Sequence, residues 1–160
     1  MNIANFNMPV GFSGNASIVE TIEPNDTIDV TASVAVTLGD FMQAMPVMKR
    51  VALESGAPFA PNTIGATLAH MNYGGSGRES GCVVLARLND NVAGFAVLTV
   101  KPDIGLELVW LHAGSEESDL VVDALWQKAS EIKVEWNFPI LHVGYFTEMP
   151  KTMRDHVSVL

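Results

Sequence analysis

The chain has 160 residues, about the length of one domain, which argues against a two-domain enzyme. It carries 18 acidic and 9 basic residues, for a formal net charge of −9, and 48% of its residues are apolar but only 17% are charged. Soluble domains average about 25% charged residues, so neutral groups, apolar groups or another chain must cover this surface. The acidic excess argues against binding to nucleic-acid phosphates, which requires clustered Lys and Arg.

Neither a membrane span nor a targeting signal is expected. No run of about 18 apolar residues occurs, and the first basic residue is Lys49, so the basic region of a secretory signal is missing. The single cysteine, Cys82, excludes an internal disulfide and a cysteine-based metal site. These observations predict synthesis in the cytoplasm, no contact with a membrane and no bound metal.

Residues 1–33 differ from the rest of the chain and are predicted to form an extended N-terminal arm. Residues 1–38 contain no Lys or Arg, and residues 29–36 alternate loosely, as a half-buried strand does. One interpretation of the first fifteen residues is a solvated tail. The other is an arm that becomes ordered on a protein partner. Its candidate contact residues are Ile3, Phe6, Met8, Val10 and Phe12.

Two helices are expected next. Asp40 can cap the first helix, which Gly56 ends. The apolar stripe of this helix comprises Met42, Met45, Met48 and Leu53. Pro46 would lie inside the helix, so two short helices are an alternative. Residues 63–73 predict the second helix, which ends at a pair of glycines.

An antiparallel hairpin follows the helices. Residues 82–88 and 92–100 are apolar runs of strand length. The turn between them is Asn89-Asp90-Asn91, a composition that favours the tight backbone of a hairpin loop.

The last part of the chain predicts a strand, a helix and a second strand. The strands are residues 106–112 and 140–146, and the amphipathic helix is residues 120–131. Its inward positions are Leu120, Val121, Ala124, Leu125 and Ala129. A strand, helix and strand of this length form a parallel crossover. The sequence therefore predicts a three-layered α+β fold with a mixed sheet.

This order of elements resembles that of the GNAT acetyltransferases over about residues 34–160. Residues 91–98 (NVAGFAVL) resemble the family's v-x-G-f entry to its central strands. Residues 106–112 resemble the strand before the cofactor loop, and residues 122–132 resemble the helix after it. The resemblance implies a GNAT-like domain with a mixed sheet, an antiparallel hairpin and a βαβ crossover.

The resemblance also identifies a cofactor loop. Active family members hold the pyrophosphate of acetyl-CoA with an Arg/Gln-x-x-Gly-x-Gly/Ala loop at a helix N-terminus. The equivalent positions here are Gly114, Ser115, Glu116, Glu117, Ser118 and Asp119. Their three carboxylates suit the helix dipole but repel a pyrophosphate. The loop therefore predicts a solvated acidic cap and no cofactor, with acetyl-CoA binding as the alternative.

The resemblance implies two weak catalytic candidates. Glu107 lies on the strand where some family members hold a general base, and an outward carboxylate is the alternative. Tyr145 lies near the place of a tyrosine that protonates the leaving thiolate, and a packed ring is the alternative. The helix that normally carries this tyrosine is reduced to about residues 147–156. His112 and His142, near two strand ends, are typical of hydrogen-bonded histidines in a core.

Three functions remain open at this point. The first is a non-catalytic GNAT-like binding or assembly module that docks on neighbouring subunits through its arm. Phages include GNAT-like proteins among their virion and host-takeover components, which makes a virion protein made in a host cytoplasm one such case. The second is an acetyl-CoA-dependent N-acyltransferase with a divergent pyrophosphate loop. The third is an inhibitor whose acidic surface mimics nucleic acid.

Overall fold

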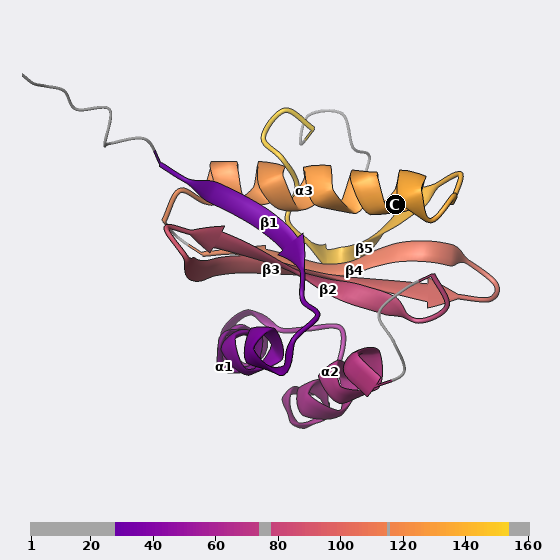
Figure 1. The fold of residues 1–160 in the computed structure, drawn as a ribbon, viewed down its shortest axis with the longest axis horizontal. Helices are drawn as coiled ribbons and strands as arrows, with labels where there is room; N and C mark the ends of the chain where they lie inside the picture. Colours follow the sequence, from indigo (N-terminus) through magenta and orange to yellow (C-terminus); the bar gives the residue numbers. More distant parts are fainter. Residues whose placement is uncertain (1–27, 74–77, 115, 154–160) are drawn as a thin grey trace, which may run out of the picture.

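The computed structural model describes residues 28–73, 78–114 and 116–153. Five strands form one sheet in the order β1-β2-β3-β4-β5. They are β1 (Val30–Val34), β2 (Gly81–Leu88), β3 (Asn91–Lys101), β4 (Gly105–Ala113) and β5 (Leu141–Thr147). The helices are α1 (Leu38–Ser55), α2 (Ile64–Tyr73) and α3 (Ser118–Glu135), and a 3-10 turn (Pro61–Thr63) precedes α2. Helices α1 and α2 lie on one face of the sheet and α3 on the other, which gives three layers (Figure 1).

The predicted mixed sheet is confirmed. β1 to β4 pair antiparallel in chain order, and β5 pairs parallel to β4 with α3 as the crossover between them. β1 pairs with β2 along its whole length, so the expected domain boundary after residue 33 falls inside this strand. The five candidate contact residues of the arm lie outside the described residues. No helix in the described part of the chain has the length and apolarity needed to cross a membrane.

The central strands β2, β3 and β4 are buried on both faces of the sheet, which explains their nearly continuous apolar sequences. Val83 and Leu85 of β2 pack toward α1 and α2, whereas Cys82 and Val84 pack toward α3. Because Cys82 is fully buried, desolvation raises the pKa of its thiol to about 12. The thiol is therefore a structural group, with no thiolate available as a nucleophile.

Helix α1 is one continuous helix, as predicted, and Pro46 does not divide it into two short helices. The exposed position of Pro46 leaves the unpaired carbonyl of Met42 open to water. The helix departs from the sequence prediction in two other ways. Its N-cap is Thr37, and Asp40 is the third residue of a capping box. Met42 and Leu53 are 62% and 75% exposed, so these two positions of the predicted stripe were wrong, whereas Met48 is buried and Met45 packs against the core. The buried face follows the helical period instead, through Phe41, Ala44, Met48, Val51 and Ala52.

Helix α3 buries three of its five predicted inward positions, Val121, Leu125 and Ala129, and Ala124 is half-buried. Leu120 is 45% exposed and points away from the sheet. The buried positions are Val121, Val122, Leu125, Trp126, Ala129 and Ile132. The Trp126 indole N–H donates to the carbonyl of Glu148 at 2.8 Å, so the helix also fixes the segment that follows β5.

Three elements meet closely at Gly94 of β3. A Cβ atom there would lie 2.7 Å from the His112 carbonyl oxygen of β4 and 2.7 Å from Cγ1 of Val121 in α3. A Cβ atom added at Gly39, in the first turn of α1, would lie 3.6 Å from its nearest neighbour, Oγ1 of Thr37, which is an ordinary contact distance.

We predict that Gly94→Ala lowers the free energy of unfolding by about 1–3 kcal/mol, because the added methyl group has no space. The matched variant Gly39→Ala should leave stability unchanged or raise it by up to about 1 kcal/mol. Urea unfolding at pH 7 measures both. Equal stability of Gly94→Ala and the unsubstituted chain would contradict the tight contact of β3, β4 and α3.

Asp40 links the start of α1 to the sheet. Its carboxylate accepts hydrogen bonds from the backbone N–H groups of Val36 and Thr37 at 3.0 and 3.1 Å. Arg87 of β2 donates to the same carboxylate at 2.9 Å. The pKa of Asp40 is lowered, chiefly by the hydrogen bond from the Thr37 backbone.

We predict that Asp40→Asn lowers the free energy of unfolding at pH 7 by about 1 kcal/mol. Because the pKa of Asp40 is lower in the folded chain than its ordinary value of 3.8, the ionised carboxylate stabilises the fold fully at pH values above 3.8. This stabilisation is lost as the pH falls through the pKa of Asp40 in the folded chain. The deficit should therefore shrink in acid. Asp103→Asn removes an exposed carboxylate that has no ion pair among the described residues and serves as the control. A deficit independent of pH would contradict the assignment.

Candidate functional site

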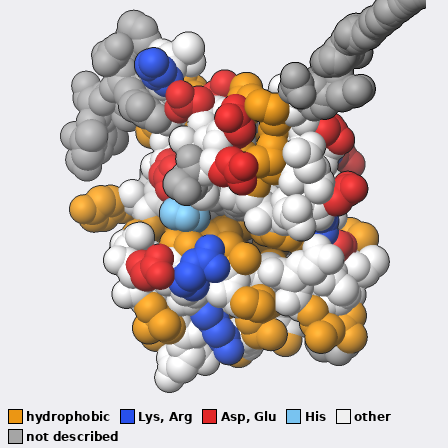
Figure 2. All heavy atoms as spheres, turned by 90° about the vertical axis from the view of Figure 1, so that its left-hand side faces the viewer, with side chains coloured by type: hydrophobic (Ala, Val, Ile, Leu, Met, Phe, Trp, Pro, Cys, Tyr) orange, Lys and Arg blue, Asp and Glu red, His pale blue; other side chains and the backbone are white. Residues whose placement is uncertain are grey.

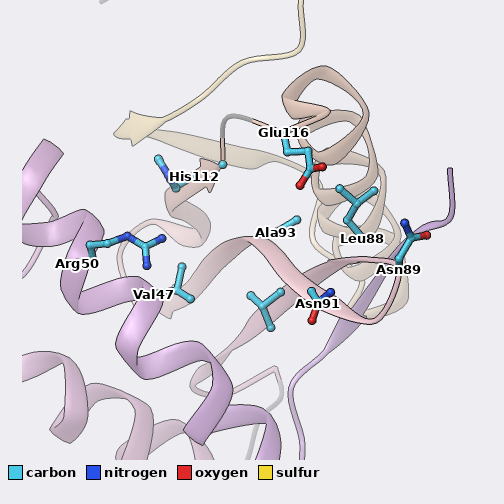
Figure 3. Close-up of a pocket in the computed structure, with 10 residues that line it drawn as sticks. Val47, Arg50, Leu88, Asn89, Asn91, Ala93, His112 and Glu116 are labelled. Atoms are coloured by element: carbon cyan, nitrogen blue, oxygen red, sulfur yellow. The ribbon is translucent and has the colours of Figure 1, made fainter.

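A pocket of about 380 Å³ opens at the end of the sheet where β4 ends and β3 begins. Figure 3 shows its walls, which come from α1, the hairpin turn, the end of β4 and the loop before α3. The lining residues are Val47, Arg50, Leu88, Asn89, Asn91, Val92, Ala93, His112, Gly114 and Glu116. Ligands of open α/β sheets bind outside the carboxyl ends of strands, which is the position of this pocket relative to β4.

His112 is the polar side chain at the end of β4. Its Nδ1 lies 2.9 Å from Oε2 of Glu148, which follows β5 directly. The Phe95 ring lies 5.9 Å from the imidazole, between ring centroids, and limits its movement. Because Nδ1–H donates to a carboxylate, Nε2 is the nitrogen left to accept a proton. A base oriented by a third group is the arrangement that general-base catalysis requires.

A bulge in β4 places His112 on the pocket side. The pairing of β3 with β4 skips Val109, since Val97 is opposite Trp110 and Leu98 is opposite Leu108. Strict alternation from Leu108 would direct His112 toward α3. With the extra residue, Leu111 packs toward α3 and His112 faces the α1 layer.

Two opposite charges border the pocket. Arg50 extends from α1 and Glu116 from the loop before α3, on different sides of the cavity (Figure 3). Both are exposed, and neither forms an ion pair within residues 28–73, 78–114 and 116–153. In Figure 2, acidic side chains predominate on the α3 side of the hollow, and basic ones lie beside it on the α1 side.

The loop predicted to contact a cofactor forms an acidic start to α3. Glu117 adopts a left-handed backbone with φ of 50° and makes no side-chain cap. Glu116, Glu117 and Asp119 are all exposed there, and Ser115 lies outside the described residues. Exposed carboxylates at this point oppose a pyrophosphate by charge repulsion. Whether acetyl-CoA binds here therefore stays a prediction from the charge of these residues.

The structure does not bring the two catalytic candidates to the pocket. Glu107 lies in the first half of β4, where Lys101 donates to its carboxylate at 2.9 Å. Tyr145 of β5 is 93% exposed and stacks on Phe146 with ring centroids 5.3 Å apart. Neither residue lines the cavity.

His112 and His142 also lie apart. His142 is opposite Glu107 at the start of β5, whereas His112 is near the end of β4. Parallel strands keep a start and an end at opposite edges of the sheet, so the two histidines cannot be neighbours. Within the described residues, no group of three His, Cys, Asp or Glu side chains could hold a metal ion.

The chain after β5 differs from the prediction of a short helix over residues 147–156. Residues 148–150 are irregular and residues 151–153 form a turn, while residues 154–156 lie outside the described part. The Glu148 N–H donates to the Leu111 carbonyl at 3.1 Å, and the Thr147 hydroxyl donates to the Leu108 carbonyl at 3.0 Å. β4 and β5 thus remain joined up to Glu148.

Sequence reasoning missed Glu148, Arg50 and the hairpin residues of the pocket. Glu148 follows the second of two predicted parallel strands, and His112 ends the first. Parallel strands bring their carboxyl ends to one edge of the sheet, so this pair could have been found from the predicted topology. No comparable sequence signal indicates that Val47 and Arg50 of α1 line the pocket.

Comparison with known proteins identifies the fold. No family model matches the sequence, and no curated protein matches it. Solved structures do match the fold. A ribosomal-protein-alanine N-acetyltransferase from Brucella melitensis biovar Abortus is 13% identical, with a TM-score of 0.55 over 82% of this chain and 92% of that chain. An integron cassette protein from the mobile metagenome of Cole Harbour Salt Marsh is 19% identical, with a TM-score of 0.56 over 71% and 76%.

A third structure contains the fold as one part of a larger protein. It is the GCN5-related glucosamine N-acetyltransferase region of a fungal multi-domain β-N-acetylglucosaminidase, which is 12% identical, with a TM-score of 0.54 over 84% of this chain and 16% of that chain. Identities this low establish the fold alone. The chain has a GNAT-like fold, similar to that of N-acetyltransferases.

Proposed function

We propose that this chain is a GNAT-like assembly module, in which the N-terminal arm of one copy covers the exposed β5 edge of a neighbouring copy. The edge is the observation that carries the proposal. β5 is the last strand of the sheet, and its outer side has no strand partner among the residues that the structure describes. Large apolar side chains are exposed on it or just before it. They are Ile140, Val143, Tyr145 and Phe146.

An edge of this kind is a site for strand pairing. Exposed edges are normally protected by lysine, proline or a covering segment, because their free backbone groups pair readily with another chain. β5 has the sequence LHVGYFT, which contains no lysine, proline or carboxylate. Such a strand can bind an extended segment through backbone hydrogen bonds and pockets for alternate side chains.

The arm has the chemistry of such a segment. Phe6, Met8, Val10 and Phe12 occupy every second position, as on one apolar face of a strand. Pro9 lies between them and has no N–H. Successive residues of a strand direct their backbone groups to opposite sides, so a strand that pairs through its even-numbered residues would not need an N–H at position 9. A fully extended segment of 27 residues, the number that precedes Ile28, spans roughly 90 Å, which is ample to contact a neighbour. Arms exchanged head to tail build rings or filaments.

The acidic start of α3 supports a role without acetyl-CoA. By the sequence resemblance, Glu116, Glu117 and Asp119 correspond to the loop with which family members present bare backbone N–H groups to phosphates. A role in a virion would be one case of such an assembly module and stays a prediction. Nucleic-acid mimicry by the acidic surface is a separate function and also stays a prediction.

A second candidate function is acyl transfer, which the His112–Glu148 pair favours. His112 Nε2 could accept the proton of an acceptor amine in the pocket, and Glu148 would hold the ring and stabilise its protonated form. The N-acetyltransferases of similar fold support the same reaction class.

We predict that the full chain self-associates and that Tyr145→Lys weakens this association at least tenfold, because a charge then occupies the edge. Phe6→Ser combined with Phe12→Ser should have the same effect. Light scattering over a concentration series measures the mass. Leu53→Lys removes an exposed leucine of α1 and should change nothing. A monomeric chain, or an assembly that survives both sets of substitutions, would overturn the proposal.

We predict that calorimetry with millimolar acetyl-CoA detects no binding, because the α3 terminus repels the pyrophosphate. Saturable binding together with transfer to an amine would instead establish the second candidate function. In that case His112→Gln should abolish the transfer, whereas Glu107→Gln and Tyr145→Phe, away from the pocket, should retain it.

A further inference from the structure

We infer that the pocket at the end of β4 binds a small zwitterion, of which a free α-amino acid with an aliphatic side chain is the model ligand. This inference is independent of the arm and of any acyl donor. It rests on two charged side chains that form no ion pair with the described residues, and on the oriented histidine and the apolar residues that line the same cavity.

The two charges on the wall suit the two charges of an amino acid. A guanidinium binds a carboxylate through two parallel N–H donors, and Arg50 has no ion pair among the described residues. Glu116, on another side of the cavity, offers a carboxylate for an ammonium group (Figure 3). A ligand with a carboxylate alone would leave Glu116 without a partner in the pocket, and a ligand with an ammonium group alone would leave Arg50 without one.

His112 adds a directed acceptor. Its Nδ1 is engaged by Glu148 at 2.9 Å, so Nε2 can accept a hydrogen bond from an ammonium N–H. Asn89 on the hairpin turn and Asn91 at the start of β3 also line the cavity, and their amides both donate and accept (Figure 3). These groups fix the polar end of a ligand without adding net charge.

The rest of the lining is aliphatic and small. Val47 comes from α1, Leu88 from the end of β2, and Val92 and Ala93 from β3. Such a surface favours the side chain of leucine or valine by removing apolar area from water. The volume of about 380 Å³ is near the lower end for ligand sites, which suits a single amino acid.

A polyanion does not fit the same pocket. Glu116 lies on its wall, so a phosphate ligand would meet a carboxylate as well as the guanidinium of Arg50. A simple amine would leave Arg50 unpaired. The combination of charges therefore selects a ligand that carries both signs.

The test is binding of L-leucine to the full chain, by calorimetry and by NMR shifts of the His112 ring. We expect saturable binding at concentrations up to about 10 mM. Leucinamide lacks the carboxylate and 4-methylpentanoate lacks the amine, so each should bind at least tenfold more weakly. Arg50→Gln and Glu116→Gln should weaken leucine binding by a similar factor.

Matched controls come from adjacent positions. Lys49→Gln and Glu117→Gln remove the same charges from side chains that do not line the cavity, and they should bind leucine as the unsubstituted chain does. The inference is overturned if leucine does not bind, if its amide binds equally well, or if the control variants lose binding as the pocket variants do. The measurement needs neither assembly nor acetyl-CoA, so its failure is distinct from failure of the proposed function.

Discussion

The extra residue at Val109 determines which groups meet at the end of the sheet. It restarts the alternation of β4, so that Leu111 packs on α3 and His112 faces the α1 layer. Parallel pairing with β5 then brings Glu148 to the imidazole. Without the bulge, His112 would be directed into the apolar core under α3, where an unpaired imidazole is costly. The pocket and its oriented histidine both depend on this local change of register.

The same parallel pairing makes β5 the outermost described strand. Helix α3 returns the chain across one face of the sheet, and the chain after Glu148 turns away without a helix through residue 153. An apolar edge without lysine, proline or carboxylate is left at the surface. The low proportion of charged residues in the whole chain is consistent with a surface that another chain covers. In the proposed assembly, the arm of one copy and this edge of another are the two parts of one interface.

Much of the fold could be predicted because its signals are local. The hairpin follows from Asn89-Asp90-Asn91 between two apolar runs, and the crossover follows from the lengths of three segments. The inward faces of α1 and α3 were less accessible, since apolar Met42 and Leu120 are exposed and only packing distinguishes them from Met48 and Val121. The site was least accessible, because a bulge has no clear sequence signal and Arg50 reaches the pocket only through the packing of α1.

Hydrogen exchange tests the arm and edge interface most directly. The account predicts that amides of residues 1–15, the first part of the arm, and of β5 become protected together as protein concentration rises, since strand pairing engages both sets of backbone groups. Amides of β1, at the opposite edge of the sheet, should exchange at the same rate throughout. Exchange of the arm and of β5 that does not depend on concentration would contradict the account.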